Sequence, residues 1–242
     1  MKNDRQFKTG EHRLRLVDRL PSREENEKEI EKIRLKRSVF WPTAFVVLLW
    51  LVKIVEILLV GLFGPQARFV RFGILPLHPE GLRGILTGPL IHGDFMHLFS
   101  NSVPLIVLGA GILYLYRPFA LRVIILVYLL GGLGVWLFAR PVYHIGASGL
   151  IYGFIAFIFW SGVFRREPRA IALALIVTFL YGGLVWGVLP IREGVSWEGH
   201  LSGAVVGAVL AYLYRKKDLP KDQDEPDDWD EEEDEDFEYW KR

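Results

Sequence analysis

The sequence contains no cysteine among its 242 residues. This absence excludes disulfide bonds, thiolate metal sites, iron–sulfur clusters and a cysteine nucleophile. Charge is also scarce, but only in one part of the chain. Residues 38–217 carry 14 basic and 6 acidic side chains, whereas the whole chain has 29 and 28. An ordinary water-facing globule of that length has many more charges. We therefore expect residues 38–217 to form an integral membrane domain.

The two ends of the chain differ from this domain and from each other. Residues 1–37 carry 12 basic and 8 acidic side chains, and residues 218–242 carry 3 basic and 14 acidic ones with almost no aliphatic residue. The mixed charges of the first segment argue against nucleic-acid binding. That segment also lacks the apolar core of a signal peptide, so the first apolar run is expected to remain as an anchor. We predict a charged cytoplasmic segment (1–37), a membrane domain (38–217) and a disordered cytoplasmic tail (218–242).

Six apolar runs divide the central region. They cover residues 39–63, 95–116, 123–138, 149–164, 170–189 and 201–214. A membrane helix needs about 20 residues at ~1.5 Å each to cross ~30 Å of hydrocarbon. The fourth and sixth runs have 16 and 14 residues. Either they do not span, or their ends lie below the membrane surface in a hydrated cavity. The predicted fold is an all-α membrane protein, a six-transmembrane-helix bundle with short buried fourth and sixth helices.

Basic residues near the ends of the runs predict their orientation. If the N-terminus is cytoplasmic, eleven Lys and Arg residues flank the runs on the inner side and five lie in the outer loops. This distribution favours six crossings with both termini in the cytoplasm. The second, fourth and sixth helices then all begin at the outer face, so their first residues share one depth. Residues 64–94 form a long, largely apolar outer loop that we expect to lie in the membrane interface.

Polar residues gather at the beginnings of these three helices. The segments read HGDFMHLFSN (92–101), GASGLIY (146–152) and WEGHLSGAVVG (197–207). Ionisable groups in membrane segments are costly and are functional candidates by default. A second polar pair, Lys53 and Glu56, lies three residues apart inside the first run, and we interpret it as an ion pair that neutralises itself.

Ser148 and His200 are the candidate catalytic pair. A serine hydroxyl is a weak nucleophile and needs a base to accept its proton, and histidine suits that task near neutral pH. Gly146 and Gly149 flank the serine and leave room for a peptide backbone. Ser148 also begins its helix, where free N–H groups and the helix dipole favour developing negative charge.

Residues near this pair could supply hydrogen-bond donors and close packing. His97 and Asn101 are four residues apart, hence on one helix face, and both can donate hydrogen bonds to an oxyanion. Tyr152 lies one turn after the serine on the same face, where it would pack against the histidine ring. Gly203 and Gly207 have the small-xxx-small spacing that lets two membrane helices approach closely.

A metal site in the outer cleft is the alternative that the residues alone leave open. Its candidate ligands are His92, His97, His144, His200 and Glu198. Against it, the first two histidines are five residues apart, about 140° around a helix, and the sequence has no His-Glu-x-x-His motif. The serine also lacks the Gly-x-Ser-x-Gly elbow of soluble hydrolases. We predict neither a metal nor a cofactor.

Taken together, these motifs resemble those of the rhomboid family of intramembrane serine proteases. The residues that carry the resemblance are Gly146-Ala-Ser148-Gly149 with Tyr152, His97-x-x-x-Asn101 preceded by His92, and His200-x-x-Gly203-x-x-x-Gly207. They occur in the family's order, and the similarity extends over about residues 65–216. One departure is the Trp-Arg pair common in the family's first loop, for which Leu82-Arg83 is the nearest remnant.

The resemblance implies a fold and a set of roles. The fold would be the six-helix rhomboid core with a hydrophilic cavity open to the outer face. Ser148 would be the nucleophile and His200 the general base, without a third acidic member. His97, Asn101 and the Ser148 N–H would form the oxyanion hole, and Tyr152 would support the base.

We therefore expect an intramembrane endopeptidase that cleaves transmembrane segments of membrane-protein substrates. Its partners would be those substrates and the lipid bilayer, and its location a bacterial cytoplasmic membrane, with an organellar membrane as the alternative. Two other function classes were weighed. A non-catalytic rhomboid-like protein that binds membrane clients would have lost Ser148 or His200, and a transporter would show an inverted repeat.

Overall fold

Each apolar run of the sequence contributes to a helix in the computed structural model, which describes residues 23–180, 185–190 and 194–217. The long helices are α2 (Arg23–Phe63), α4 (Phe95–Leu115), α5 (Ala120–Phe138), α6 (Ser148–Arg165), α7 (Pro168–Leu180) and α8 (Trp197–Tyr214). Shorter elements join them: η1 (Pro65–Ala67), η2 (Phe69–Phe72), η3 (Pro79–Arg83), α3 (Gly84–Thr87), η4 (Gly88–Leu90) and η5 (Val185–Val188). The predicted acidic tail and most of the predicted N-terminal segment lie outside the described residues.

The prediction of a helical membrane domain is confirmed. Within the described residues, α2, α4, α5 and α6 are long and apolar enough to cross a membrane. α7 is described over 13 residues, and α8 has 18 residues but opens with a polar turn. Six crossings therefore stay a prediction.

α8 begins at Trp197, the residue at which the sixth helix was expected to open. The side chain of Ser196 caps the helix and accepts a hydrogen bond from the Gly199 N–H (3.3 Å). One predicted boundary needs correction. The fifth run was expected to be one helix over 170–189, and this was wrong at its end, since residues 185–188 form the separate 3-10 helix η5.

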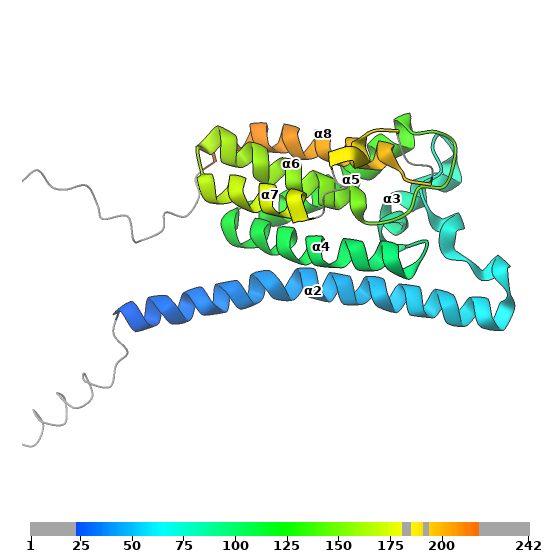
Figure 1. Cartoon of the computed structure of the whole chain (residues 1–242), viewed down its shortest axis with the longest axis horizontal. Helices are drawn as coiled ribbons and strands as arrows, with labels where there is room; N and C mark the ends of the chain where they lie inside the picture. The colour runs from blue at the N-terminus through cyan, green and yellow to red at the C-terminus, as the bar shows by residue number, and fades with distance from the viewer. Residues whose placement is uncertain (1–22, 181–184, 191–193, 218–242) are drawn as a thin grey trace, which may run out of the picture.

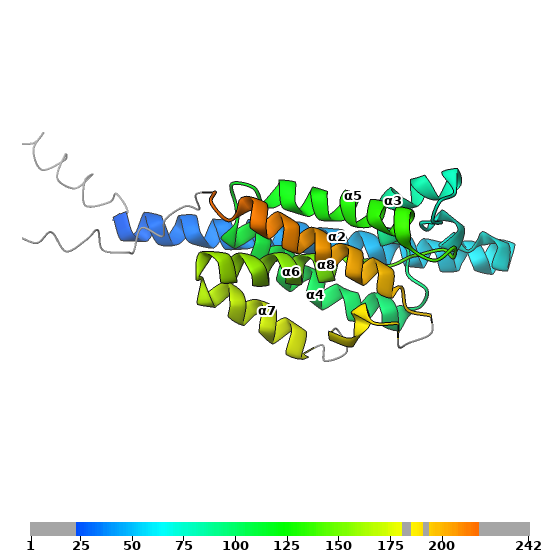
Figure 2. The same ribbon diagram turned by 90° about the horizontal axis from the view of Figure 1, so that it is seen from above.

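α2 is the longest helix and lies along α4 (Figure 1). The Trp50 indole N–H donates to the Ser102 hydroxyl (3.1 Å), and an added Cβ at Gly109 would lie 3.0 Å from the Pro42 ring. α6 packs closely against α8, which crosses it when the bundle is seen from above (Figure 2). This contact sets the distance between the two residues that the sequence nominates for catalysis.

The segment between α2 and α4 is held against the bundle by its backbone. Ile74 and His144 exchange both backbone hydrogen bonds (2.9 and 2.8 Å), and the Leu77 N–H donates to the Trp136 carbonyl (3.0 Å). Arg83, the remnant of the loop's Trp-Arg pair, places its guanidinium 5.1 Å from the centre of the Phe72 ring. The segment is thus fixed to the α5–α6 connection, directly before the start of α6.

Candidate active site

Ser148 and His200 lie on facing helices within hydrogen-bond distance of each other. Ser148 is the first residue of α6 and His200 lies in the first turn of α8. The His200 Nε2 is 2.7 Å from the Ser148 Oγ, and its Nδ1 is 2.7 Å from the Gly187 carbonyl oxygen. Because a carbonyl oxygen only accepts, Nδ1 carries the ring proton and Nε2 is free to accept from serine. This is the tautomer that a general base requires.

Glycines bring the two helices to this distance. An added Cβ at Gly203 would overlap the Gly149 carbonyl oxygen, and one at Gly207 would overlap the Gly153 carbonyl oxygen. These positions therefore allow the backbone of α8 to touch that of α6. His200 lies one turn before Gly203 on the same helix, so this contact holds the imidazole beside the serine.

Tyr152 and Gly187 fix the plane of the imidazole. The Tyr152 and His200 rings are stacked, with centroids 4.1 Å apart and planes 12° apart. Gly187 belongs to η5, where an added Cβ would overlap the Tyr152 hydroxyl and lie 3.0 Å from the His200 Nδ1. No sequence motif marks Gly187, because this residue acts through its carbonyl and its lack of a side chain.

Gly146, two residues before the serine, lies against the His97 ring. Gly146 has a φ of +104°, and an added Cβ there would come 2.6 Å from the His97 Cε1. Glycine is thus required both by the backbone conformation and by the space that His97 occupies. The Asp94 carboxylate caps α4 by accepting from the His97 N–H (2.8 Å), and this hydrogen bond lowers the pKa of Asp94.

His92 links the start of α4 to the start of α6. Its Nε2 is 3.0 Å from the Asn101 Nδ2 and 3.4 Å from the Ala147 backbone nitrogen. Both partners are donors, so the His92 Nε2 is the acceptor, which requires a neutral ring. Burial, followed by the neighbouring His97, lowers the pKa of His92 to about 3 and keeps it neutral. The contact with His92 uses one of the two amide hydrogens of Asn101.

A further set of contacts joins the segment before Ser148 to the start of α8. The His144 Nδ1 is 2.6 Å from the Ser196 Oγ, and its Nε2 donates to the Arg140 carbonyl (3.0 Å). Arg140 also forms an ion pair with Glu198, with 3.1 Å between Nε and Oε1. Burial lowers the pKa of His144, so the ring is neutral and accepts from the Ser196 hydroxyl. From the sequence, His144 and Glu198 were expected only as candidate metal ligands, and no motif marks Ser196.

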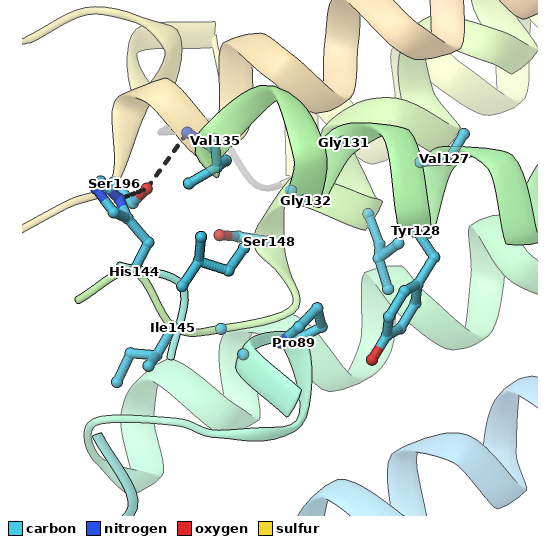
Figure 3. A pocket seen from close by; sticks show the side chains of 16 residues that line it. Pro89, Val127, Tyr128, Gly131, Gly132, Val135, His144, Ile145, Ser148 and Ser196 are labelled. Carbon is cyan, nitrogen blue, oxygen red and sulfur yellow. Dashed lines mark hydrogen bonds between the residues drawn. The ribbon is translucent and has the colours of Figure 1, made fainter. Parts of the chain in front are cut away.

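A small pocket of about 50 Å³ opens beside Ser148. Figure 3 shows His144 and Ser196 on one side of it and the α5 residues Val127 and Tyr128 on the other. Glycines form much of its wall: Gly88, Gly131, Gly132, Gly146, Gly149 and Gly199. Its size suits a small side chain. Within the residues that the structure describes, no three His, Asp or Glu side chains converge as metal ligands would.

The sequence is similar to one protein family and to several individual proteins. The model of the family described as "Rhomboid domain" matches residues 79–217. An uncharacterized protein of Mycobacterium tuberculosis (strain H37Rv) is 41% identical over 178 residues, which cover 70% of this chain and 72% of that protein. An uncharacterized protein of Mycobacterium leprae is 37% identical over 178 residues, 70% of this chain and 68% of the relative. A putative rhomboid protein of Acanthamoeba polyphaga mimivirus is 33% identical over 85 residues, 34% of this chain and 42% of that protein.

Proposed function

Since the chain belongs to the rhomboid family, we propose that it is an intramembrane serine endopeptidase that cleaves transmembrane segments of membrane proteins. The observation that carries this proposal is the 2.7 Å contact between the Ser148 Oγ and the His200 Nε2, with the opposite ring nitrogen donating to the Gly187 carbonyl. A serine that only packs and a histidine that only lies in the interface do not require the ring proton on Nδ1. A nucleophile and its base require it, because Nε2 must be free to accept the serine proton.

The reaction follows from these positions. The Ser148 Oγ attacks the scissile carbonyl carbon while the His200 Nε2 takes its proton. The carbonyl oxygen becomes an oxyanion, which accepts from the Ser148 N–H at the start of α6 and from Asn101 and His97. The imidazolium then gives its proton to the leaving amine as the peptide bond breaks. Water, deprotonated by the same histidine, hydrolyses the acyl-enzyme and restores Ser148.

The site also restricts the substrate. A peptide bond inside a helix is shielded by its own hydrogen bonds, so a cleavable segment must unwind locally. The pocket of about 50 Å³ beside Ser148 favours small side chains at the cleaved bond. Substrates are therefore membrane helices with small, helix-destabilising residues near the cleavage point.

The topology belongs to the same proposal. The protein crosses a bacterial cytoplasmic membrane six times and keeps both termini in the cytoplasm. Three observations support this: the distribution of Lys and Arg, four helices with the length and apolarity of membrane spans, and mycobacterial relatives.

The test is cleavage of a model transmembrane substrate in proteoliposomes. Wild-type protein is expected to cleave it, and Ser148→Ala and His200→Ala to abolish cleavage. Ser38→Ala is the matched control, since the Ser38 hydroxyl donates to the Leu35 carbonyl of its own helix (2.8 Å). Unchanged cleavage by Ser148→Ala would falsify the assignment.

A fluorophosphonate probe separates the enzyme from a non-catalytic client binder. Labelling of the wild type and the Ser38→Ala control, but not of Ser148→Ala, supports an activated serine. A wild type that retains a transmembrane client without cleaving it or reacting with the probe would support the binder instead.

A further inference from the structure

Two charged residues are buried in α2, far from either end of that helix. Lys53 and Glu56 are only 8% and 7% exposed, and the Lys53 Nζ lies 2.8 Å from the Glu56 Oε2. Lys53 is ten residues before the end of α2, about 15 Å along its axis. A buried ion pair contributes little to stability by itself, because the cost of removing both charges from water offsets their attraction. Their other contacts therefore decide what the pair does.

Those contacts reach the two ends of the segment that connects α2 to α4. The Lys53 Nζ donates to the His92 and Gly93 carbonyl oxygens, both at 3.0 Å. An ammonium has three hydrogens, so these two bonds and the ion pair use all of them. The second carboxylate oxygen of Glu56 accepts from the Phe69 N–H (2.8 Å). The pair is thus a bridge from α2 to both ends of the connecting segment, and more than a self-neutralising one.

The residues held by Lys53 are those that support the candidate oxyanion hole. His92, whose carbonyl it binds, accepts from Asn101 and from the Ala147 N–H, directly before the nucleophile. Gly93 directly precedes Asp94, whose carboxylate caps α4 at the His97 N–H. A single ammonium therefore fixes the backbone from which both proposed oxyanion donors of α4 are oriented.

We propose that Lys53 is a positioning residue for the oxyanion hole, and that Glu56 holds its ammonium in place and couples it to the start of the connecting segment. This inference rests on the proposed function. Lys53 touches neither the serine nor the histidine of the dyad in the described contacts, so it acts through His92 and Gly93. Its loss shifts the donors that bind the transition state and leaves the substrate-binding surface in place. The effect therefore falls on kcat and not on KM.

The variants must separate positioning from stability. Lys53→Met leaves the Glu56 carboxylate buried without its cation, which lowers thermal stability as well as kcat. The double variant Lys53→Met/Glu56→Gln removes both charges, so we expect it to recover thermal stability. It still lacks the donor to the two carbonyls, and its kcat is expected to stay about tenfold or more below wild type with KM within twofold. Glu56→Gln alone keeps that donor and is expected to lose less activity.

The matched control is the exposed pair Glu29 and Lys32, which has the same spacing on the same helix. Lys32→Met is expected to leave kcat unchanged. A double variant Lys53→Met/Glu56→Gln that is as stable as wild type and equally fast would overturn the positioning role, as would a loss confined to KM.

Hydrogen–deuterium exchange tests the bridge without relying on protease activity. In the full chain in proteoliposomes, the backbone amides of residues 92–98 are expected to exchange faster in Lys53→Met/Glu56→Gln than in wild type or Lys32→Met. If the wild type does not cleave but this difference is present, the proposed function fails and the bridge stands. If the wild type cleaves and the exchange is identical in all variants, the bridge fails and the function stands.

Discussion

The proton on the His200 Nδ1 is held by the backbone carbonyl of Gly187, where soluble serine proteases use a carboxylate. A carbonyl fixes the tautomer and the ring direction, but it carries no net charge to stabilise the imidazolium. One hydrogen bond does not by itself fix the plane of the ring, because the ring can rotate about that bond. The stacked Tyr152 ring and the missing side chain at Gly187 fix the plane by their shape, because together they leave the imidazole one plane to occupy.

Asn101→Ala is expected to lower kcat by about 10²–10³-fold with a small change in KM, since it removes one donor to the oxyanion. It also removes one of the two donors that the His92 Nε2 accepts from. Steady-state cleavage in proteoliposomes measures the effect. Ser100→Ala is the control on the preceding residue, because the exposed Ser100 hydroxyl donates to the His97 carbonyl of its own helix (2.9 Å). Equal kcat values for the two variants would remove Asn101 from the oxyanion hole.

At the scale of elements, the contact between α6 and α8 positions the dyad. The two catalytic candidates come from different helices, so their 2.7 Å separation is maintained only if the helices keep one distance and one register. Small residues on both helices allow the backbones to touch, and a membrane offers little hydrophobic force to replace that contact. The polar first turn of α8 is capped by Ser196, which also contacts His144, and these contacts set the register at the start of α8.

Gly203→Ala is expected to separate α8 from α6, because the new Cβ overlaps the Gly149 carbonyl oxygen. The expected results are a loss of about 1–3 kcal/mol in the free energy of unfolding and at least a tenfold fall in kcat. Unfolding in mixed micelles and cleavage in proteoliposomes measure the two quantities.

Gly61→Ala provides the comparison for this substitution. Gly61 lies near the end of α2, and an added Cβ there meets nothing within 4 Å. The same chemical change is expected to leave activity unaltered and stability equal or slightly higher. If Gly203→Ala behaved like Gly61→Ala, close packing of the two helices would not be what holds the dyad together.

For the molecule as a whole, the described helices form a bundle in which α2 runs along α4 and the segment 64–94 lies at the opposite end from the start of α2 (Figure 1). Basic residues are concentrated in the first part of α2, before its apolar run, and directly after the end of α8. With an even number of crossings these two ends share one side of the membrane, and the candidate site opens on the other.

Topology reporters test this arrangement. Green fluorescent protein fused to the N-terminus or to the C-terminus is expected to fluoresce in bacteria, and alkaline phosphatase fused after Arg242 to be inactive. Phosphatase fused after residue 68, within the proposed outer loop, is expected to be active and serves as the positive control. An active phosphatase at the C-terminus together with a fluorescent N-terminal fusion would mean an odd number of crossings.

The sequence by itself determined the helical membrane domain and nominated the residues of the site. Apolar runs long enough to bury their backbone polar groups have no stable alternative to a helix in a bilayer, so composition suffices for that conclusion. Ser148, His200, His97 and Asn101 could be selected because they lie in or directly before such runs, where polar side chains are costly. These inferences depend on residue type and spacing, which a sequence displays.

Only the tertiary structure decided how those residues are held. Gly187 contributes a carbonyl, Ser196 and His144 meet across two loops, and Lys53 reaches backbone oxygens about 40 positions later in the chain. Every residue carries a backbone carbonyl, and every residue except proline carries an N–H, so nothing in a sequence marks the one that a distant side chain will bind. The same reason explains why the pair in α2 was interpreted as self-neutralising: its spacing is visible in the sequence, but its partners appear only when the chain is folded.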